Sequence, residues 1–253
     1  LLAGLLAEGE TTVIEKHPSR DHTERMLAHF GAQIKVVGRQ SLVIGRKEFD
    51  GITVDVPGDI SSAAFFIVSA LLVPNSELLI RNVGLNPTRT GIIDVLHRMG
   101  ANLEIVNEQV ICEEPRGDIK IQSSKIKAQK IGGEIIPRII DEIPIIALAA
   151  TQAEGITEIV GVRELRVKES DRIKTVCSEL KKMGAKIAER EDGMVIEGGT
   201  KLQGARVKSY GDHRIAMMLA VAGLIADGET EIENTDCIGT SFPGFEDLLR
   251  KLS

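Results

Sequence analysis

The chain has 253 residues and 43% of them are apolar, which allows a buried core in one large or two medium-sized domains. With 31 Lys and Arg residues against 37 Asp and Glu residues, the formal net charge is −6, which argues against a dedicated nucleic-acid-binding protein. A small anionic ligand fits this composition only if basic side chains gather locally.

The chain opens on an apolar run, Leu1–Ala7, that is too short to cross a membrane. The run has neither a methionine start nor the basic region of a signal peptide. We therefore expect a helix cut through its middle, in a chain that lacks the start of its protein.

An amphipathic helix that ends in Gly-Ala and leads into a strand recurs three times. The copies are Met26–Ala32, Val95–Ala101 and Leu180–Ala185. Glycine is favoured after the last turn of a helix, because the residue there often takes a left-handed backbone conformation. Alternating apolar and polar residues follow each copy, which predicts strands.

A second recurring element precedes these helices. An apolar, alanine-rich helix leads through a polar turn into a β-branched strand, and the four turns lie at Glu8-Gly9, Pro74-Asn75, Glu154-Gly155 and Asp227-Gly228. The repeat unit is therefore about 70 residues long, in the order helix, strand, helix, strand, strand. Gly and Pro residues predict a linker, and the main domain boundary, near Lys47–Pro57.

Polar residues introduce the apolar helices, at Gly58–Ser62, Ile140–Pro144 and Gly211–Arg214. Asp and Ser are ordinary helix N-caps, so we expect Asp59, Ser61 and Asp212 to cap. His213 and Arg214 are different, because cations at a helix N-terminus oppose the helix dipole. This placement is explained if an anion binds between the helix end and the guanidinium group.

The densest group of charges is Arg163–Arg172, just before a helix with one apolar face. Ser170 is the expected N-cap of that helix, which gathers Lys168, Glu169 and Arg172 at its start. Such a cluster is compatible with a solvated surface of ion pairs or with an anion-binding site.

The sequence indicates no metal and no cofactor. Cys112, Cys177 and Cys237 lie far apart without a C-x-x-C motif, so we expect no disulfide framework, no zinc site and a cytoplasmic location. No set of metal ligands accompanies His22, and no G-x-G-x-x-G or Walker loop indicates a nucleotide. No apolar run reaches the roughly 18 residues of a membrane-spanning helix.

Five short motifs follow one another along the chain: Ser19–Glu24 (SRDHTE), Asn86–Gly91 (NPTRTG), Lys168–Arg172 (KESDR), Gly211–Arg214 (GDHR) and Ser241–Pro243 (SFP). In this order they resemble the motifs of the 5-enolpyruvylshikimate-3-phosphate synthase family. No single motif is decisive, but five in order are specific, and the resemblance covers essentially the whole chain. The spellings are closest to the bacterial branch that is less sensitive to glyphosate.

The resemblance implies an α/β (α+β) fold of repeated βαβαββ units, the two-domain inside-out barrel of the enolpyruvyl transferases, with helix N-termini facing the cleft between the domains. Residues 1–50 would be the remainder of a first domain that is mostly missing, and residues 51–253 would form the second domain. The helices that end at Gly31, Gly100 and Gly184 should then be equivalent.

The activity implied by the resemblance belongs to the shikimate pathway of aromatic amino acid biosynthesis. The enolpyruvyl group of phosphoenolpyruvate passes to the 5-hydroxyl of shikimate 3-phosphate and phosphate is released, without metal or organic cofactor, in a complete enzyme expected to be monomeric. Protonation of the methylene makes C2 electrophilic, the hydroxyl attacks, and the tetrahedral phosphate ketal loses phosphate. Two phosphates and two carboxylates in one cleft require several Lys and Arg side chains.

Matching motifs assign roles to the residues of the acceptor side. Asp141 would take the 5-hydroxyl proton and hold shikimate 3-phosphate, together with Ser19 and Lys168. Glu169 would take part in proton transfer.

On the donor side, Arg172 and Arg214 would bind phosphoenolpyruvate and His213 would line the phosphate site. The sequence departs from the pattern of some family members at three positions, which are His22, Glu164 and Thr240. The family's N-terminal motifs are also missing upstream of Leu1, so we expect this chain alone to be inactive.

Three alternatives stay open at this point. UDP-N-acetylglucosamine enolpyruvyl transferase shares the fold and the donor, but the SRDHTE and KESDR motifs fit it poorly. A non-catalytic ligand-binding protein on the same fold would not need its acidic and basic motif residues in one cleft. A nucleic-acid-processing relative built from similar repeats is disfavoured by the net charge and the missing nucleotide loops.

Overall fold

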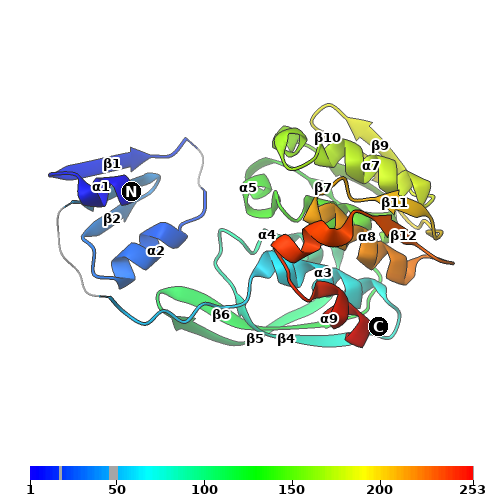
Figure 1. Cartoon of the computed structure of the whole chain (residues 1–253), viewed down its shortest axis with the longest axis horizontal. Coiled ribbons are helices and arrows are strands. Elements are labelled where there is room, and N and C mark those ends of the chain that lie inside the picture. Colours follow the sequence, from blue (N-terminus) through cyan, green and yellow to red (C-terminus); the bar gives the residue numbers. More distant parts are fainter. Residues whose placement is uncertain (17–18, 46–50, 253) are drawn as a thin grey trace.

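The computed structural model describes residues 1–16, 19–45 and 51–252. They form a small N-terminal lobe and a larger C-terminal lobe, and the segment that follows residue 51 runs without helix or strand from one to the other (Figure 1). The predicted linker near Lys47–Pro57 therefore lies partly outside the described residues, and the domain boundary at residues 50 and 51 stays a prediction.

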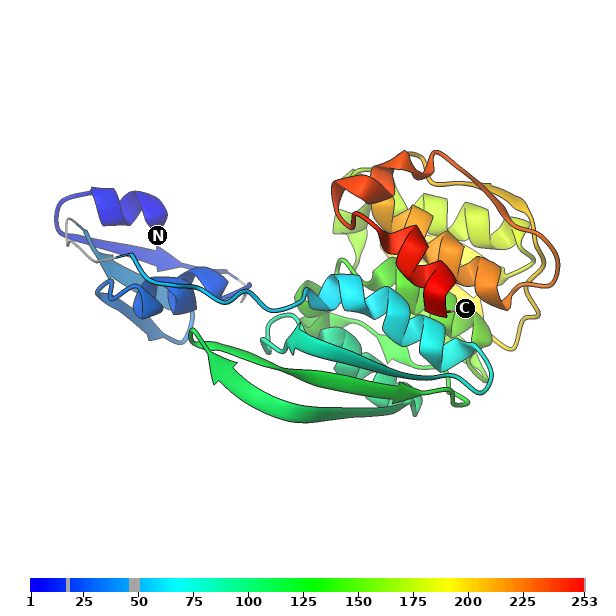
Figure 2. The same cartoon turned by 60° about the horizontal axis from the view of Figure 1, so that its bottom comes forward.

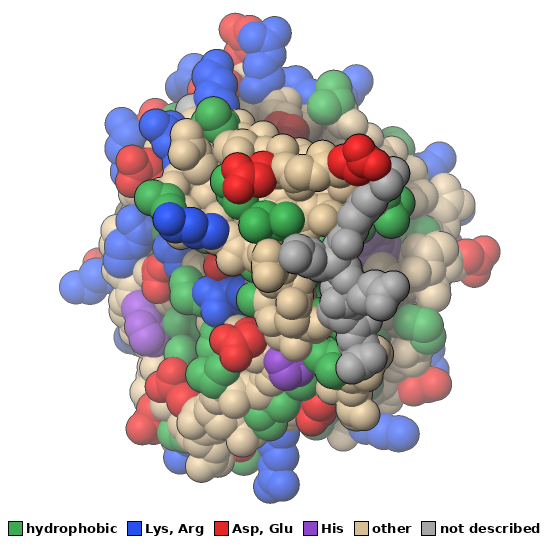
Figure 3. Space-filling view, turned by 90° about the vertical axis from the view of Figure 1, so that its left-hand side faces the viewer, with side chains coloured by type: hydrophobic (Ala, Val, Ile, Leu, Met, Phe, Trp, Pro, Cys, Tyr) green, Lys and Arg blue, Asp and Glu red, His purple; other side chains and the backbone are tan. Residues whose placement is uncertain are grey.

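The N-terminal lobe is one repeat unit. Its elements are α1 (Leu2–Leu6), β1 (Glu10–Ile14), α2 (His22–His29), β2 (Ile34–Val37) and β3 (Gln40–Ile44). The sheet order is β1-β3-β2 with antiparallel neighbours. Leu27, Ala32 and Val43 are buried, while Leu2, Leu6, Ile14, Val36 and Val37 are exposed. Figure 3 faces this end of the molecule and shows hydrophobic side chains at its surface.

The C-terminal lobe begins with a second unit of the same order, which consists of α3 (Ile60–Leu72), β4 (Glu77–Gly84), α4 (Gly91–Met99), β5 (Asn102–Ile111) and β6 (Glu114–Gln122). The long β5–β6 hairpin extends toward the N-terminal lobe (Figure 2). The strand order is β4-β6-β5, so the last strand again lies in the middle.

A third unit follows, made of β7 (Lys130–Ile131), η1 (Gly133–Ile135), α5 (Ile136–Ile139), α6 (Ile143–Gln152), β8 (Ile156–Ile159), η2 (Arg163–Val167), α7 (Arg172–Lys182), β9 (Lys186–Arg190) and β10 (Gly193–Glu197). Its sheet order is β7-β8-β10-β9, and β7 is parallel to β8. The fourth copy keeps β11 (Arg206–Lys208), α8 (His213–Ile225) and a parallel β12 (Glu231–Glu233), and then continues as η3 (Thr235–Thr240) and α9 (Phe245–Leu252).

The prediction of equivalent units is confirmed. The three Gly-Ala helices are α2, α4 and α7, and the glycines that follow their last turns, Gly31, Gly100 and Gly184, have φ values of 82°, 89° and 89°. Only glycine adopts this left-handed conformation without strain. The shared strand order differs from a single doubly wound parallel sheet and shows that one unit has been repeated.

Three helices, α3, α6 and α8, form the centre of the C-terminal lobe and pack against one another. Each is apolar on most of its surface, which is typical of a helix buried on all sides. Alanines such as Ala64, Ala147 and Ala216 are fully buried and allow the helices to approach closely. The polar residues that introduce these helices consequently meet at one end of the bundle.

The sequence predicted the helix caps only in part. Asp59 and Asp212 cap α3 and α8, accepting hydrogen bonds from the amides of Ser62 and Arg214. The cap of α7 is Asp171, because its carboxylate accepts from the amide of Lys174 at 3.0 Å, so the expectation for Ser170 was wrong.

Ser61 does not cap α3 either, since it lies inside the first turn and its hydroxyl bonds Glu142. The SFP motif has a packing role. Phe242 lies edge-on to Phe66 with 5.8 Å between ring centroids, and Phe245 contacts both rings. Such aromatic pairs fasten the C-terminal segment to α3.

Candidate active site

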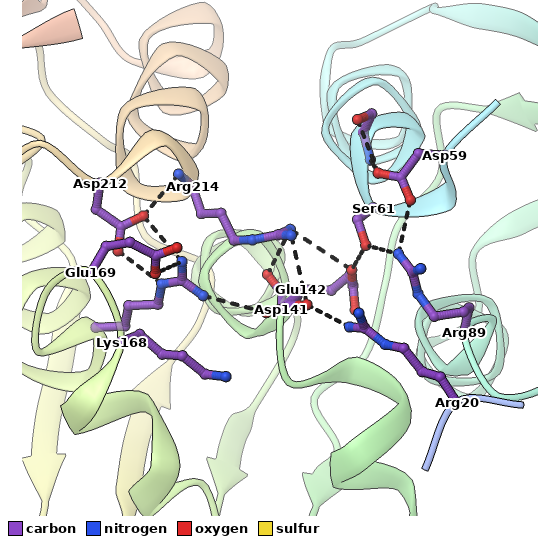
Figure 4. A network of polar contacts seen from close by, with 12 residues as sticks. Arg20, Asp59, Ser61, Arg89, Asp141, Glu142, Lys168, Glu169, Asp212 and Arg214 are labelled. Atoms are coloured by element: carbon purple, nitrogen blue, oxygen red, sulfur yellow. Dashed lines mark hydrogen bonds and ion pairs between the residues drawn. The ribbon is translucent and has the colours of Figure 1, made fainter. Parts of the chain in front are cut away.

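The candidate site lies where α6, α7 and α8 begin. Asp141, Arg172 and Arg214 come from these three starts, and Figure 4 shows the Arg214 side chain reaching toward Asp141. Three helix N-termini also bring their positive dipole ends to the same place, which favours bound anions.

Arg172 is the central cation of the cluster, although only 1% of its side chain is exposed. Its Nε donates to Asp212 Oδ2 at 2.8 Å and an Nη2 proton goes to Glu169 Oε2 at 2.5 Å. The Nη1 atom lies 3.5 Å from Asp141 Oδ1 and has no hydrogen-bond partner among the described residues. The pairs compensate the cost of burying this charge, while Nη1 remains able to donate to a ligand.

Asp141 is surrounded by three arginines. Arg20 Nη2 donates to its Oδ2 at 2.6 Å, Arg214 Nη2 lies 3.7 Å from the same atom, and Arg172 lies on the other oxygen. Burial by itself would raise the pKa of Asp141, but the charges of Arg214, Arg20 and Arg172 outweigh it and lower the pKa below the usual value. In this arrangement Asp141 is an ionised hydrogen-bond acceptor.

Arg214 connects the start of α8 to that of α6. Its Nη1 donates to the carbonyl of Asp141 at 3.3 Å and lies 4.0 Å from Glu142 Oε1. Glu142 is 3% exposed, and burial raises its pKa above the ordinary value. Two adjacent carboxyl groups, Asp141 and Glu142, thus have pKa values shifted in opposite directions.

Asp212 and His213 complete this side of the site. Asp212 is fully buried, and although burial raises its pKa, the hydrogen bond and charge of Arg172 lower it on balance. His213 is half-buried, and its pKa is lowered by burial and by the neighbouring Arg214, so the imidazole is neutral at pH 7. The cationic character of this helix start therefore comes from arginine.

Lys168 and Glu169 stand at the entrance of the site, just after η2. The Lys168 ammonium pairs with Glu164 at 2.6 Å, and the Glu169 side chain is half exposed. Figure 4 shows Lys168 beside Glu169, on the same side of the site as Asp212. Glu164, one of the three positions that depart from the family pattern, thus contacts a predicted substrate-binding lysine.

Ser19 lies apart from the other predicted site residues. Its hydroxyl donates to Glu15, within its own lobe. It lines a cavity of about 1180 Å³ between the two lobes, opposite Thr88 and Arg138 of the C-terminal lobe. The structure therefore brings together six of the seven predicted residues and places the seventh on the wall of the space between the lobes.

Two residues of this cluster were missed by the sequence reasoning. Arg20 makes the shortest contact to Asp141, and its position beside Ser19 inside the SRDHTE motif was an available signal. Glu142 had been grouped with ordinary residues of a helix start, and only tertiary packing shows that it is buried.

Within residues 1–16, 19–45 and 51–252, no group of three or more His, Cys, Asp or Glu side chains is placed to hold a metal ion. In the same ranges, no helix has both the length and the apolar character needed to span a bilayer.

The repeated units and the cluster of cations at helix starts define an enolpyruvyl-transferase-type protein. The fold alone is shared with the enolpyruvyl transferase NikO from Streptomyces tendae, with a TM-score of 0.79 at 20% identity, over 99% of this chain and 57% of that one. A much closer likeness is to the EPSP synthase from Acinetobacter baumannii, with a TM-score of 0.95 at 44% identity, over 100% of this chain and 59% of the other.

The EPSP synthase (3-phosphoshikimate 1-carboxyvinyltransferase) family matches residues 1–249, and the chain belongs to this family. It is 56% identical over its whole length to the 3-phosphoshikimate 1-carboxyvinyltransferase of Brevibacillus brevis and 54% identical to that of Bacillus cereus. In both cases the chain spans 59% of the relative's length.

Proposed function

We propose that the chain supplies the donor-binding and proton-transfer groups of a 3-phosphoshikimate 1-carboxyvinyltransferase, which moves the enolpyruvyl group of phosphoenolpyruvate to the 5-hydroxyl of shikimate 3-phosphate and releases phosphate. The observation that carries the proposal is the convergence of Arg20, Arg172 and Arg214 on Asp141, with Lys168 and Glu169 alongside. A non-catalytic protein on this fold would have no need of such a cluster.

In the proposed reaction, the arginines exchange partners when the substrates bind. Arg172 and Arg214 turn toward the carboxylate and phosphate of phosphoenolpyruvate, where the planar guanidinium can form two parallel hydrogen bonds. The Nη1 of Arg172, which lacks a hydrogen-bond partner among the described residues, supports this assignment. His213, neutral at the start of α8, lines the phosphate side without adding charge.

The same exchange changes the basicity of Asp141. Its pKa is low because Arg214, Arg20 and Arg172 stabilise the carboxylate against the effect of burial. When substrate anions attract these arginines, Asp141 loses part of that stabilisation and its pKa rises. A carboxylate that gains basicity on substrate binding is suited to accept the 5-hydroxyl proton.

Glu169 is the proposed partner for proton transfer at the methylene carbon. It is held by Arg172 at 2.5 Å and is half exposed, so it can exchange protons with solvent between turnovers. Lys168, after release from Glu164, would bind shikimate 3-phosphate together with Ser19 of the N-terminal lobe. The cytoplasmic location and the monomeric state of the complete enzyme stay predictions.

The test is a phosphate-release assay on a polypeptide that carries these 253 residues together with the part of the relatives that they leave uncovered. Turnover should require both phosphoenolpyruvate and shikimate 3-phosphate. UDP-N-acetylglucosamine in place of shikimate 3-phosphate should give none, and phosphate release with the nucleotide sugar alone as acceptor would contradict the proposal.

Variants R172A and R214A assign the donor site. Each should raise the KM for phosphoenolpyruvate more than the KM for shikimate 3-phosphate, and R172K should also be impaired because lysine lacks the two-pronged geometry. Arg98, exposed on α4 away from the site, is the matched control as R98A. An unchanged KM for phosphoenolpyruvate in both R172A and R214A would contradict the assignment of these arginines to the donor site.

A further inference from the structure

The NPTRTG motif, Asn86–Gly91, has no role in the chemistry above, yet its side chains bond to both lobes. It forms the connection between β4 and α4. On one side it contacts the start of α2 in the N-terminal lobe, and on the other it contacts the start of α3 and the residues of α5. Polar contacts to both lobes suit a loop that fixes the position of one lobe relative to the other.

The contact with the N-terminal lobe is made by Asn86, of which only 2% is exposed. Its Nδ2 donates to Asp21 Oδ1 at 2.7 Å and to Glu114 Oε2 at 3.0 Å, while its Oδ1 accepts from the amide of Thr88 at 2.9 Å. The other oxygen of Glu114 lies 2.7 Å from His22 Nδ1. We call Asp21, His22, Asn86 and Glu114 the Asn86 junction.

The Asn86 junction fixes the backbone beside a site residue. Asp21 directly follows Arg20, whose guanidinium makes the 2.6 Å contact to Asp141. Arg25, one turn into α2, reinforces the contact by donating to Asp21 at 2.9 Å and to the carbonyl of Glu113 at 3.1 Å. Holding Asp21 therefore limits where Arg20 can reach.

The contact with the active-site helices is made by Arg89. Its Nη2 donates to Asp59 Oδ1 at 2.8 Å and to Ser61 Oγ at 2.7 Å, and the Ser61 hydroxyl in turn donates to Glu142 (Figure 4). Glu142 follows Asp141 in the chain. This path of hydrogen bonds thus ends one residue from the carboxylate that Arg20 contacts.

The backbone of the motif also packs against the segment that precedes Asp141. Arg138 Nε donates to the carbonyl of Pro87 at 2.6 Å. A Cβ atom at Gly91 would lie 2.5 Å from Ile139 Cγ2 and 3.0 Å from the Arg138 carbonyl, so only glycine permits this approach. The loop therefore touches Arg138 and Ile139, which closely precede Asp141 in the chain.

We propose that Asn86 and Arg89 are positioning residues that set the two lobes in register at the active site, with Asn86 holding the Arg20 side and Arg89 holding the Asp141 side. The consequence for catalysis rests on the proposed function, whereas the structural coupling does not. Removing the Asn86 side chain should loosen the Arg20 side and leave the Asp141 side in place, and removing the Arg89 side chain should do the reverse.

Amide hydrogen exchange of the 253-residue chain tests the coupling. N86A should accelerate exchange in α2 about tenfold, because a buried hydrogen-bonded contact to that helix is lost. R89M should leave α2 unchanged and accelerate exchange in the first turns of α3, which Arg89 contacts directly, and of α6, which it reaches through Ser61. N102A and R98M, which alter exposed side chains of the same lobe, are the matched controls.

D21A removes the same contact to Asn86 from the N-terminal lobe, and it replaces N86A as the test if N86A does not fold. D21A also removes the pair with Arg25, so the double variant D21A/N86A should accelerate α2 exchange no more than D21A alone, in which the contact to Asn86 is already lost. The proposal is overturned if N86A accelerates α2 exchange as much in the D21A background as in the parent, or if N86A and R89M accelerate both lobes to the same extent.

The catalytic consequence is measured in the phosphate-release assay described above. N86A should raise the KM for shikimate 3-phosphate at least about fivefold with a small effect on that for phosphoenolpyruvate, whereas R89M should chiefly lower kcat. The reverse pattern would overturn the assignment of sides. If the parent protein shows no turnover, the proposed function fails, and the exchange experiment still decides whether the junction exists.

Discussion

The two lobes are built from the same unit but are stabilised very differently. In the C-terminal lobe the three central helices α3, α6 and α8 are covered by sheets, and their side chains form one continuous core. In the N-terminal lobe a single unit keeps Leu27, Ala32 and Val43 buried and leaves several larger apolar side chains in solvent. The unit therefore acquires its stability from its neighbours, as in other repeat architectures.

The strongest effect that we expect is on activity. The 253-residue chain alone should turn over at least about a thousandfold more slowly than the longer polypeptide of the phosphate-release assay, since correct orientation of two substrates is worth about 7–11 kcal/mol. Phosphate release measured at equal molar concentrations checks this. Comparable rates would show that one complete lobe with one repeat unit suffices for catalysis.

The next effect concerns the buried ion pairs of the C-terminal lobe. R172M should lower the free energy of unfolding of that lobe by about 3–5 kcal/mol, because it leaves the buried Asp212 carboxylate without its partner. Urea denaturation followed by circular dichroism measures the change. R166M, which removes partly exposed ion pairs with Asp171 and Glu189, should cost less. Equal losses in the two variants would mean that burial of Arg172 has no energetic role.

Acidification should change the stability of the C-terminal lobe, because the site carboxyl groups with shifted pKa values lie in that lobe. The pKa values of Asp141 and Asp212 are lower in the folded chain than in the unfolded chain, so they contribute stability above the usual aspartate pKa of about 4 that is lost as the pH falls through their folded values. Glu142 has the opposite sign, because its raised pKa favours the protonated folded form.

Thermal unfolding between about pH 7 and pH 3 should therefore show the C-terminal lobe losing stability at the acid end, and D212N should flatten this dependence. E142Q should slightly increase stability at pH 7, since it removes a buried charge and keeps an acceptor for Ser61. A steeper acid loss in D212N than in the parent would contradict the lowered pKa of Asp212.

The weakest effect uses a matched pair of fully buried valines, Val43 in the N-terminal lobe and Val221 in the C-terminal lobe. Each change to alanine should cost about 1–2 kcal/mol. V43A should bring exchange in β1 and β3 close to that of an unfolded chain. V221A should leave α8 protected, because the C-terminal lobe remains stably folded after a loss of this size. Equal protection of both lobes in V43A would contradict the comparison.

Local features of the fold could be predicted from the sequence because they depend on neighbouring residues. The glycines after α2, α4 and α7 marked the helix ends, and the spacing of the turns indicated the unit. The choice between Ser170 and Asp171 as the cap of α7 could not be made, since both are good caps and the difference lies in the local backbone conformation.

The site was predictable only as a set of residues. The motifs named Arg172 and Arg214, but pattern reasoning could not show that Arg20 bonds a carboxylate 121 residues away or that Ser61 bonds Glu142. Such contacts depend on how three helices pack at their N-termini. Tertiary packing also reversed the expectation for Ser61, which was predicted to cap a helix and instead links two of them.

The meeting of three helix starts at one end of the bundle affects how anions approach the site. The chain carries a net charge of −6, which at long range repels phosphorylated metabolites. Close to the mouth of the bundle, the aligned dipoles and the arginines reverse the local potential, and low-dielectric walls focus it. Binding of a dianion there depends on ionic strength in a way that the net charge does not predict, because added salt screens the distant repulsion first and the short-range attraction last.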